Sequence, residues 1–121
     1  MTIAHATVAA QASVSNAAGA TQTGSWVDLT AAYKASILAK ITNGGTGPTV
    51  GCTISIDLSP DNGTTIYAGA GGKFLAGVTA SITYPAVFDL PEDAMYARVV
   101  FTGNTGQAVT VQADVTKLTG L

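Results

Sequence analysis

A regular alternation of residue types runs through Val50-Gly51-Cys52-Thr53-Ile54-Ser55-Ile56-Asp57-Leu58. Every second residue is apolar and the residues between are small or polar, which is the period of a β-strand with one buried and one solvated face. The next residues, Ser59-Pro60-Asp61-Asn62-Gly63-Thr64-Thr65, are a cluster of turn formers. The pattern therefore predicts a strand that ends in a tight turn.

Shorter alternating segments recur along the rest of the chain. They predict further strands at 6–16, 26–29, 35–42, 66–68, 78–90, 97–101 and 109–115. Pro85 lies inside the longest of these segments, which predicts an edge strand or a bend because proline donates no ladder hydrogen bond. About eight short strands in 121 residues predict an all-β chain. We expect a single domain, 1–121, built as an antiparallel β-sandwich or a jelly-roll-like domain.

Glycine-rich segments separate the predicted strands. Asn43–Pro48 and Gly103–Gly106 have the composition of hairpin loops, so each is expected to join two paired neighbours. The glycines between Gly69 and Gly72 predict a flexible loop, and the small residues 17–24 predict another loop.

The charge content limits the partners of the chain. Charged residues make up 10% of it, the net charge is −2, and the five basic residues are scattered singly. Binding to nucleic acid or to an anionic membrane would require clustered Lys and Arg, so neither partner is expected. Typical domains carry roughly 25% charged residues. We therefore expect part of this surface to be covered by other copies or by a larger assembly.

Residue types that carry chemistry are scarce. The single histidine is His5 and the single cysteine is Cys52, which falls on the buried face of its strand and is expected to act as a core residue. These two residues cannot build a Cys/His metal site or a supported nucleophile. Gly69-Ala70-Gly71-Gly72-Lys73 lacks the Gly-Lys-Ser/Thr ending of a phosphate loop. We expect no catalytic residues, no cofactor and no metal, and hence no enzyme.

The carboxylates could in principle form sites of two further kinds. Asp57, Asp61, Glu92 and Asp93 show no spacing that suggests a glycosidase pair in a cleft. Asp57, Asp61 and Asn62 offer the oxygen ligands that Ca²⁺ prefers, but few carboxylates, so a calcium site stays an open alternative.

The turn after the central strand resembles the Asp-box, a Ser-X-Asp-X-Gly-X-Thr-aromatic turn of sialidases and other β proteins. Ser59, Asp61, Gly63 and Thr65 match this pattern, and Ile66 stands at the aromatic position. A carboxylate in such a turn can accept backbone N–H bonds, and glycine takes a φ that other residues resist. The interpretation is a structural hairpin turn in which Asp61 and Gly63 are the key residues.

A broader resemblance extends from Gly24 onward. It rests on four segments, namely Trp26-Val27-Asp28-Leu29, Ile41-Thr42-Asn43 with Gly47-Pro48, Ile56 to Gly63, and Ala97 to Asn104. Together they resemble small β-sandwich structural proteins of tailed bacteriophage virions. The resemblance implies a capsid decoration or cement protein that binds the major capsid protein, or a tail or head-completion protein. The chain lacks a signal-peptide pattern and a long apolar run, so it is expected to be made in the host cytoplasm and to end up in the virion.

Two further expectations concern surfaces. Residues 1–16 are a candidate N-terminal arm that adds a strand to a neighbour, with Thr2, Thr7, Val8 and Val14 as interface residues, while pairing within its own sheet is the alternative. A homo-oligomer is expected, and a trimer would fit the three-fold points of a capsid. An extracellular carbohydrate-binding or adhesin module remains a second hypothesis. It would stack sugars on exposed aromatic residues, for which the candidates are Trp26, Tyr33, Tyr67 and Tyr84.

Overall fold

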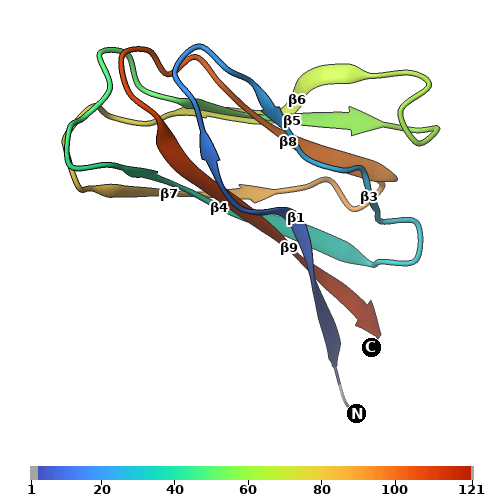
Figure 1. Ribbon diagram of the computed structural model, residues 1–121. Coiled ribbons are helices and arrows are strands. Elements are labelled where there is room, and N and C mark those ends of the chain that lie inside the picture. The colour runs from blue at the N-terminus through green and yellow to red at the C-terminus, as the bar shows by residue number, and fades with distance from the viewer. Residues whose placement is uncertain (1–2, 121) are drawn as a thin grey trace.

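The computed structural model describes residues 3–120, and its strands form two packed antiparallel sheets (Figure 1). The strands are β1 (Ala4–Asn16), β2 (Gln22–Thr23), β3 (Val27–Asp28), β4 (Lys34–Asn43), β5 (Thr53–Ser59), β6 (Tyr67–Leu75), β7 (Thr83–Asp89), β8 (Tyr96–Thr102) and β9 (Val109–Gly120). Sheet A has the order β1-β9-β4-β7, and sheet B has the order β2-β8-β5-β6 with β3 also paired to β8. The predicted all-β sandwich is confirmed.

The chain passes from one sheet to the other at nearly every connection. β2 and β3 occupy one interrupted position beside β8, so the nine strands fill eight places in the two sheets. Two four-place sheets linked by crossing connections form a jelly roll, which is one of the two architectures predicted. In residues 3–120 no helix is long and apolar enough to cross a membrane.

The core lies between the sheets and consists of the inward-facing residues, which alternate with outward-facing ones along the strands. Ile37, Ile41, Ile54, Ile56 and Phe101 are fully buried there. Burying one side chain of this size stabilises the fold by about 1.5–3 kcal/mol. Cys52 is also fully buried, as predicted from its place in the alternation.

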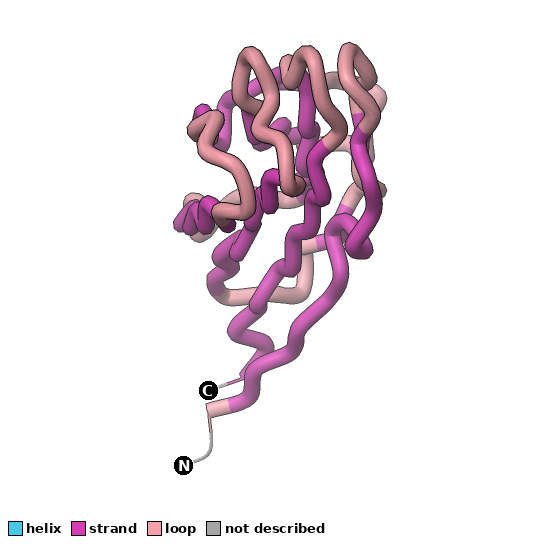
Figure 2. Tube along the Cα trace, turned by 60° about the vertical axis from the view of Figure 1, so that its left-hand side comes forward, coloured by secondary structure: helices cyan, strands magenta, loops and turns pink. Residues whose placement is uncertain are grey.

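Both predicted glycine-rich hairpins are wrong. The Asn43–Pro48 segment leads from β4 in sheet A to β5 in sheet B, and Gly103–Gly106 leads from β8 in sheet B to β9 in sheet A. The one pair of consecutive strands that forms a complete hairpin is β5 and β6. The two glycine-rich loops thus cross from sheet to sheet, and they lie at the end of the molecule opposite the termini (Figures 1 and 2).

The predicted flexible loop at Gly69–Gly72 is also wrong, because these residues lie inside β6. β6 bulges against β5 between the pairs Ile56↔Gly72 and Leu58↔Tyr67. Gly72 has φ +123°, and a Cβ there would contact the ring of Phe88 from sheet A at 2.7 Å. The glycines therefore form a bulged strand over the core.

The first strand departs from the predicted alternation. Ala10 is buried, whereas Val8 and Ala12 are exposed. Register shifts between Ala9 and Val14 insert extra residues and change the face toward which later side chains point. β1 and β9 pair along their length and bring the two ends of the described chain together at one end of the molecule (Figures 1 and 2).

β7 is the opposite edge of sheet A and contains Pro85, so the predicted edge strand is confirmed. The 17–24 segment, expected to be a loop throughout, contains the short strand β2.

Candidate interaction surfaces

The turn between β5 and β6 is held by its own side chains. The Ser59 hydroxyl donates to Asp61 Oδ1 (2.9 Å) and accepts the backbone N–H of Gly63 (2.8 Å), while Asp61 Oδ1 accepts the N–H of Thr65 (2.6 Å). The hydrogen bond from Thr65 is the main cause that lowers the pKa of Asp61 below its ordinary value. Asn62 and Gly63 have φ of 56° and 94°. In this turn the Asp61 carboxylate therefore accepts a backbone N–H bond, and Gly63 takes a positive φ.

Trp26, which lies between β2 and β3, packs against this turn. Between the pairs Thr23↔Val100 and Val27↔Ala97, the segment that carries Trp26 has one residue more than the facing part of β8. This bulge turns the indole of Trp26 onto the outer face of the sheet. A Cβ on Gly63 would overlap the indole Nε1. The Arg98 guanidinium lies 4.5 Å from the centre of the indole ring, in the arrangement of a cation–π contact.

Arg98 also joins Trp26 to a buried carboxylate. Its Nε donates to Asp57 Oδ2 at 3.0 Å, and Asp57 Oδ1 accepts the backbone N–H of Gly69 at 2.9 Å. Both carboxylate oxygens of Asp57 are thus engaged within the protein. Sequence patterning does not indicate this layer of Asp57, Arg98 and Trp26, because the cross-strand pair Asp57↔Arg98 is visible only after the sheet order is known.

The other candidate chemical residues lie apart. Glu92 and Asp93 are exposed in the turn between β7 and β8, and His5 is exposed on β1. Burial raises the pKa of the Cys52 thiol to about 11. Within residues 3–120 no three His, Cys, Asp or Glu side chains are grouped closely enough to hold a metal ion. The calcium hypothesis gains no support from Asp57, whose oxygens face Arg98 and Gly69.

The four aromatic candidates for sugar stacking are distributed over different elements. Trp26 is half-buried on Arg98, and Tyr84 packs over Gly77 in the core region. Tyr33 follows β3 and is 55% exposed, and Tyr67 begins β6 and is 58% exposed. Two of the four are therefore occupied by internal packing.

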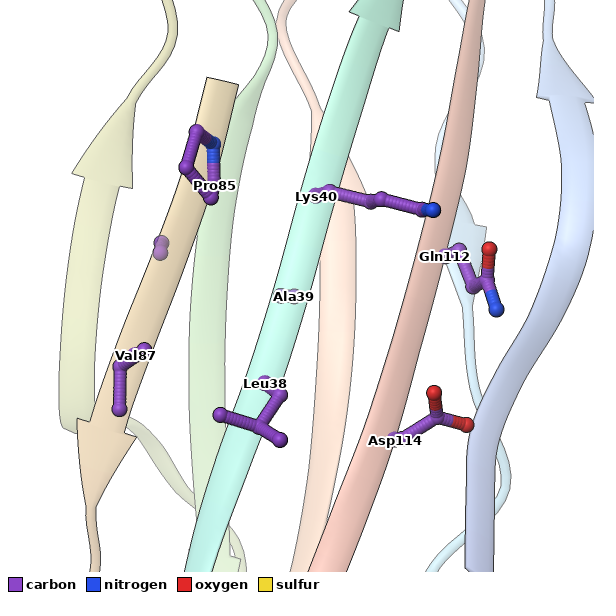
Figure 3. A pocket seen from close by; sticks show the side chains of 8 residues that line it. Leu38, Ala39, Lys40, Pro85, Val87, Gln112 and Asp114 are labelled. Carbon is purple, nitrogen blue, oxygen red and sulfur yellow. The ribbon is translucent and has the colours of Figure 1, made fainter. Parts of the chain in front are cut away.

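The outer face of sheet A carries an apolar depression of about 260 Å³. Leu38 from β4 and Pro85 and Val87 from β7 lie side by side in it, and β9 adds Gln112 and Asp114 (Figure 3). Leu38 and Val87 are directly paired across the strands and are 45% and 65% exposed. One positive and one negative side chain, Lys40 and Asp114, border this patch, which we call the sheet A patch.

A second depression, of about 210 Å³, opens at the end of the sandwich beside the Asp61 turn. Its wall includes Leu58, Tyr67 and Met95, the last being 44% exposed. A third, of about 280 Å³, lies between His5, Lys34 and Thr116 on the outer side of sheet A. All three are open depressions on the surface.

The residues predicted for an N-terminal interface have different fates. Thr2 lies outside the described residues. Thr7 is exposed, Val8 is 38% exposed, and Val14 packs against the core. Ala4–Asn16 pairs with β9 of the same chain. This pairing is the alternative to a free arm that the sequence left open.

No protein-family model matches the sequence, and no curated protein matches it. Among solved structures, the chain is similar to one described as the structure of infectious bursal disease virus, Gx strain, with 16% identity and a TM-score of 0.55 over 98% of this chain and 33% of that chain. It is also similar to a family 16 carbohydrate-binding module, with 14% identity and a TM-score of 0.47 over 82% of this chain and 70% of the module. The chain spans about a third of the length of the viral chain. At this identity the likeness to the viral structure concerns the fold.

Proposed function

We propose that the protein is a non-enzymatic structural component of a tailed-phage virion, a decoration protein that binds the capsid shell and stabilises it. The observation that carries the proposal is the composition of the surface. In the described part of the chain, large exposed apolar and aromatic side chains are as numerous as the charged residues of the whole sequence. Such a surface favours a protein that works while covered by partners.

The sheet A patch is the proposed contact with the shell protein. Leu38, Pro85 and Val87 form an apolar centre, and Lys40 and Asp114 at its border cancel in charge. Interfaces commonly have such an apolar centre and a polar rim. A patch of this kind suits a neutral, apolar surface on the partner. The jelly-roll fold, which also occurs in capsid domains, is compatible with the role but does not by itself imply it.

The proposal is tested with capsid shells that lack this protein, prepared from the phage whose genome encodes the chain. We expect the purified protein to co-sediment with these shells in a sucrose gradient and to raise the temperature at which they disrupt. Shells that neither bind the protein at saturating concentration nor gain heat resistance would remove the decoration role. Binding to tail or neck particles in the same assay would reassign the protein to a tail or head-completion role.

A pair of matched variants locates the contact. Val87→Glu places a charge in the sheet A patch, and we expect it to weaken shell binding at least tenfold. Leu75→Glu is the control, because Leu75 is 63% exposed on an edge strand of the other sheet, close to the 65% of Val87. Equal losses for the two variants would show that the sheet A patch is not the contact.

A carbohydrate-binding role is the second candidate, and one observation favours it. Tyr67 is exposed at the depression that also contains Ser59 and Asp93, so an aromatic ring and polar groups meet there. Such a site would hold a sugar ring against the tyrosine. A glycan array separates the two functions: specific binding that Tyr67→Ala abolishes would favour the sugar-binding role.

A further inference from the structure

The structure contains four sheet edges, and three of them carry features that block pairing with another strand. β7 has Pro85 near its middle and Asp89 at its end. β6 is interrupted by its glycine bulge and carries Lys73. The edge beside β8 consists of the two-residue strands β2 and β3. Proline, bulges, charges and short length are the usual devices that keep sheet edges from joining.

β1 forms the fourth edge and is different along half of its length. It is thirteen residues long and contains neither Pro nor Lys, Arg, Asp or Glu. Its second half is protected, because register shifts follow Ala9 and because Gly24 approaches the carbonyl of Ala10 closely. From His5 to Ala9, by contrast, the register with β9 is regular. Within residues 3–120, β1 pairs with β9 on one side and with no strand on the other.

The segment His5–Ala9 lies at the end of sheet A where the two ends of the described chain come together (Figure 2). It pairs with residues 114–118 of β9, which pair on their other side with residues 34–38 of β4. Val8 points to the same side as its partner Val115, yet Val8 is 38% exposed while Val115 is fully buried. An apolar side chain on the core side of the sheet is thus left partly uncovered on this edge strand.

We propose that His5–Ala9 pairs antiparallel with the same segment of a second copy of the chain, so that the two A sheets join into one continuous sheet. Another edge of this chain would meet the proline, the bulge or the charges described above, so a strand contact between copies is best made by β1 with β1. Like strands that pair in this way are related by a two-fold axis. The proposal thus favours a two-fold dimer over the trimer expected from the sequence, and it does not depend on the proposed function.

The register follows from the geometry of the segment. A two-fold axis perpendicular to the sheet must lie midway between the two copies of one residue, because directly opposed residues share a face. Thr7 is the centre of the regular segment, so Thr7 would face Thr7 of the second copy. Val8 would then lie opposite Ala6 of that copy, and His5 opposite its Ala9. Apart from His5, which faces an alanine, the facing side chains are small or β-branched, and no acidic or basic residue of β1 opposes its own copy.

The test measures the mass of the full chain in solution by sedimentation equilibrium. Two short strands bury less surface than a standard interface, so the dimer is expected to be weak and to require a concentration series. We expect the average mass to rise with concentration from 12.0 kDa toward twice that value. A monomer up to about 1 mM, a concentration at which even weak specific contacts are populated, would overturn the proposal.

Charge substitutions at Thr7 test the register. Thr7→Lys and Thr7→Glu each place like charges opposite one another, and we expect each to raise the dissociation constant at least tenfold. An equimolar mixture of the two variants places opposite charges together and is expected to restore a heterodimer. Ser13→Lys is the control, because Ser13 is also exposed on β1 but lies in the shifted region. A dimer that Thr7→Lys leaves intact, or a mixture that does not associate, would show that β1 does not pair with itself.

Discussion

The amides of Asn16 and Asn104 are hydrogen-bonded to one another inside the molecule, with Asn16 Nδ2 donating to Asn104 Oδ1 at 2.7 Å. Asn104 Nδ2 in turn donates to the carbonyls of Asn16 (3.1 Å) and Gln107 (3.0 Å). Both side chains are almost fully buried. The pair therefore ties the end of β1 to the connection between β8 and β9, which passes from one sheet to the other.

Replacing Asn104 with alanine is expected to destabilise the protein by about 2 kcal/mol or more, because buried polar groups of Asn16 and Gln107 lose their partner. Urea unfolding at neutral pH measures the loss. Gln107→Ala is the control, since Gln107 takes part through its backbone carbonyl and its side chain is exposed. If both variants unfold at the same urea concentration, the amide pair does not hold this connection.

Gly63→Ala is expected to lower the free energy of unfolding by about 1–3 kcal/mol for two reasons. An alanine there must keep a positive φ, and its Cβ overlaps Trp26. Gly19→Ala separates the two causes: Gly19 has φ +75°, but a Cβ there would meet no atom within 4 Å. The smaller effect should belong to Gly19. Because the chain has one tryptophan, its fluorescence reports any displacement of the indole. Equal destabilisation and an unchanged emission spectrum would contradict the packing of Trp26 on this turn.

These contacts show what the sequence could and could not predict. The positions of the strands followed from local alternation, because burial of one face of a strand sets the residue types at every second position of that same strand. Ile54 and Ile56, for example, are fully buried as predicted. Pro85 likewise marked an edge strand, because its missing N–H is a local property.

The order of the strands did not follow from such local signals. Asn43–Pro48 and Gly103–Gly106 have the composition of hairpin turns, yet both lead to the other sheet. Asn43 and Asn104, one in each connection, are buried and bond to distant backbone carbonyls. Composition shows that a chain can turn, whereas such long-range partners decide where it goes. The layer of Asp57, Arg98 and Trp26 was missed for the same reason.

Removing one partner of the Asp57 and Arg98 pair is expected to destabilise the fold. Arg98→Met leaves the carboxylate of Asp57, whose side chain is 7% exposed, without its cation. Breaking a fully buried pair costs about 3–5 kcal/mol, and because the Arg98 side chain is 23% exposed we expect about 2 kcal/mol. Adding Asp57→Asn should recover part of the loss, since the unpaired charge is removed. A double variant whose loss equals the sum of the single losses would show that the two side chains are not coupled.

Acid is expected to weaken the turn at Asp61. The Thr65 N–H bond lowers the pKa of Asp61 in the folded protein below 3.8, its ordinary value. The contribution of the ionised Asp61 carboxylate to the stability of the fold is thus present above its pKa in the unfolded chain. This contribution is lost as the pH falls through the pKa of Asp61 in the folded protein. We expect the melting temperature of Asp61→Asn to change less than that of the wild type between about pH 5 and about pH 2. If the melting temperature of Asp61→Asn falls with pH as steeply as that of the wild type, the carboxylate of Asp61 is not the cause of the acid sensitivity.

Burial raises the pKa of the Cys52 thiol from 9.0 to about 11. The folded pKa is the higher one, so the contribution to stability is complete below the unfolded pKa and is lost as the pH rises through about 11. The thiolate is the reactive form, and Cys52 is fully buried. We expect a maleimide at neutral pH to modify the native protein very slowly and the urea-unfolded protein within minutes. In a Cys52→Ala background, Ser13→Cys should react at once in the native state. Rapid labelling of native Cys52 would mean that the segment around Cys52, which leads into β5, opens from the core far more often than the burial of Cys52 implies.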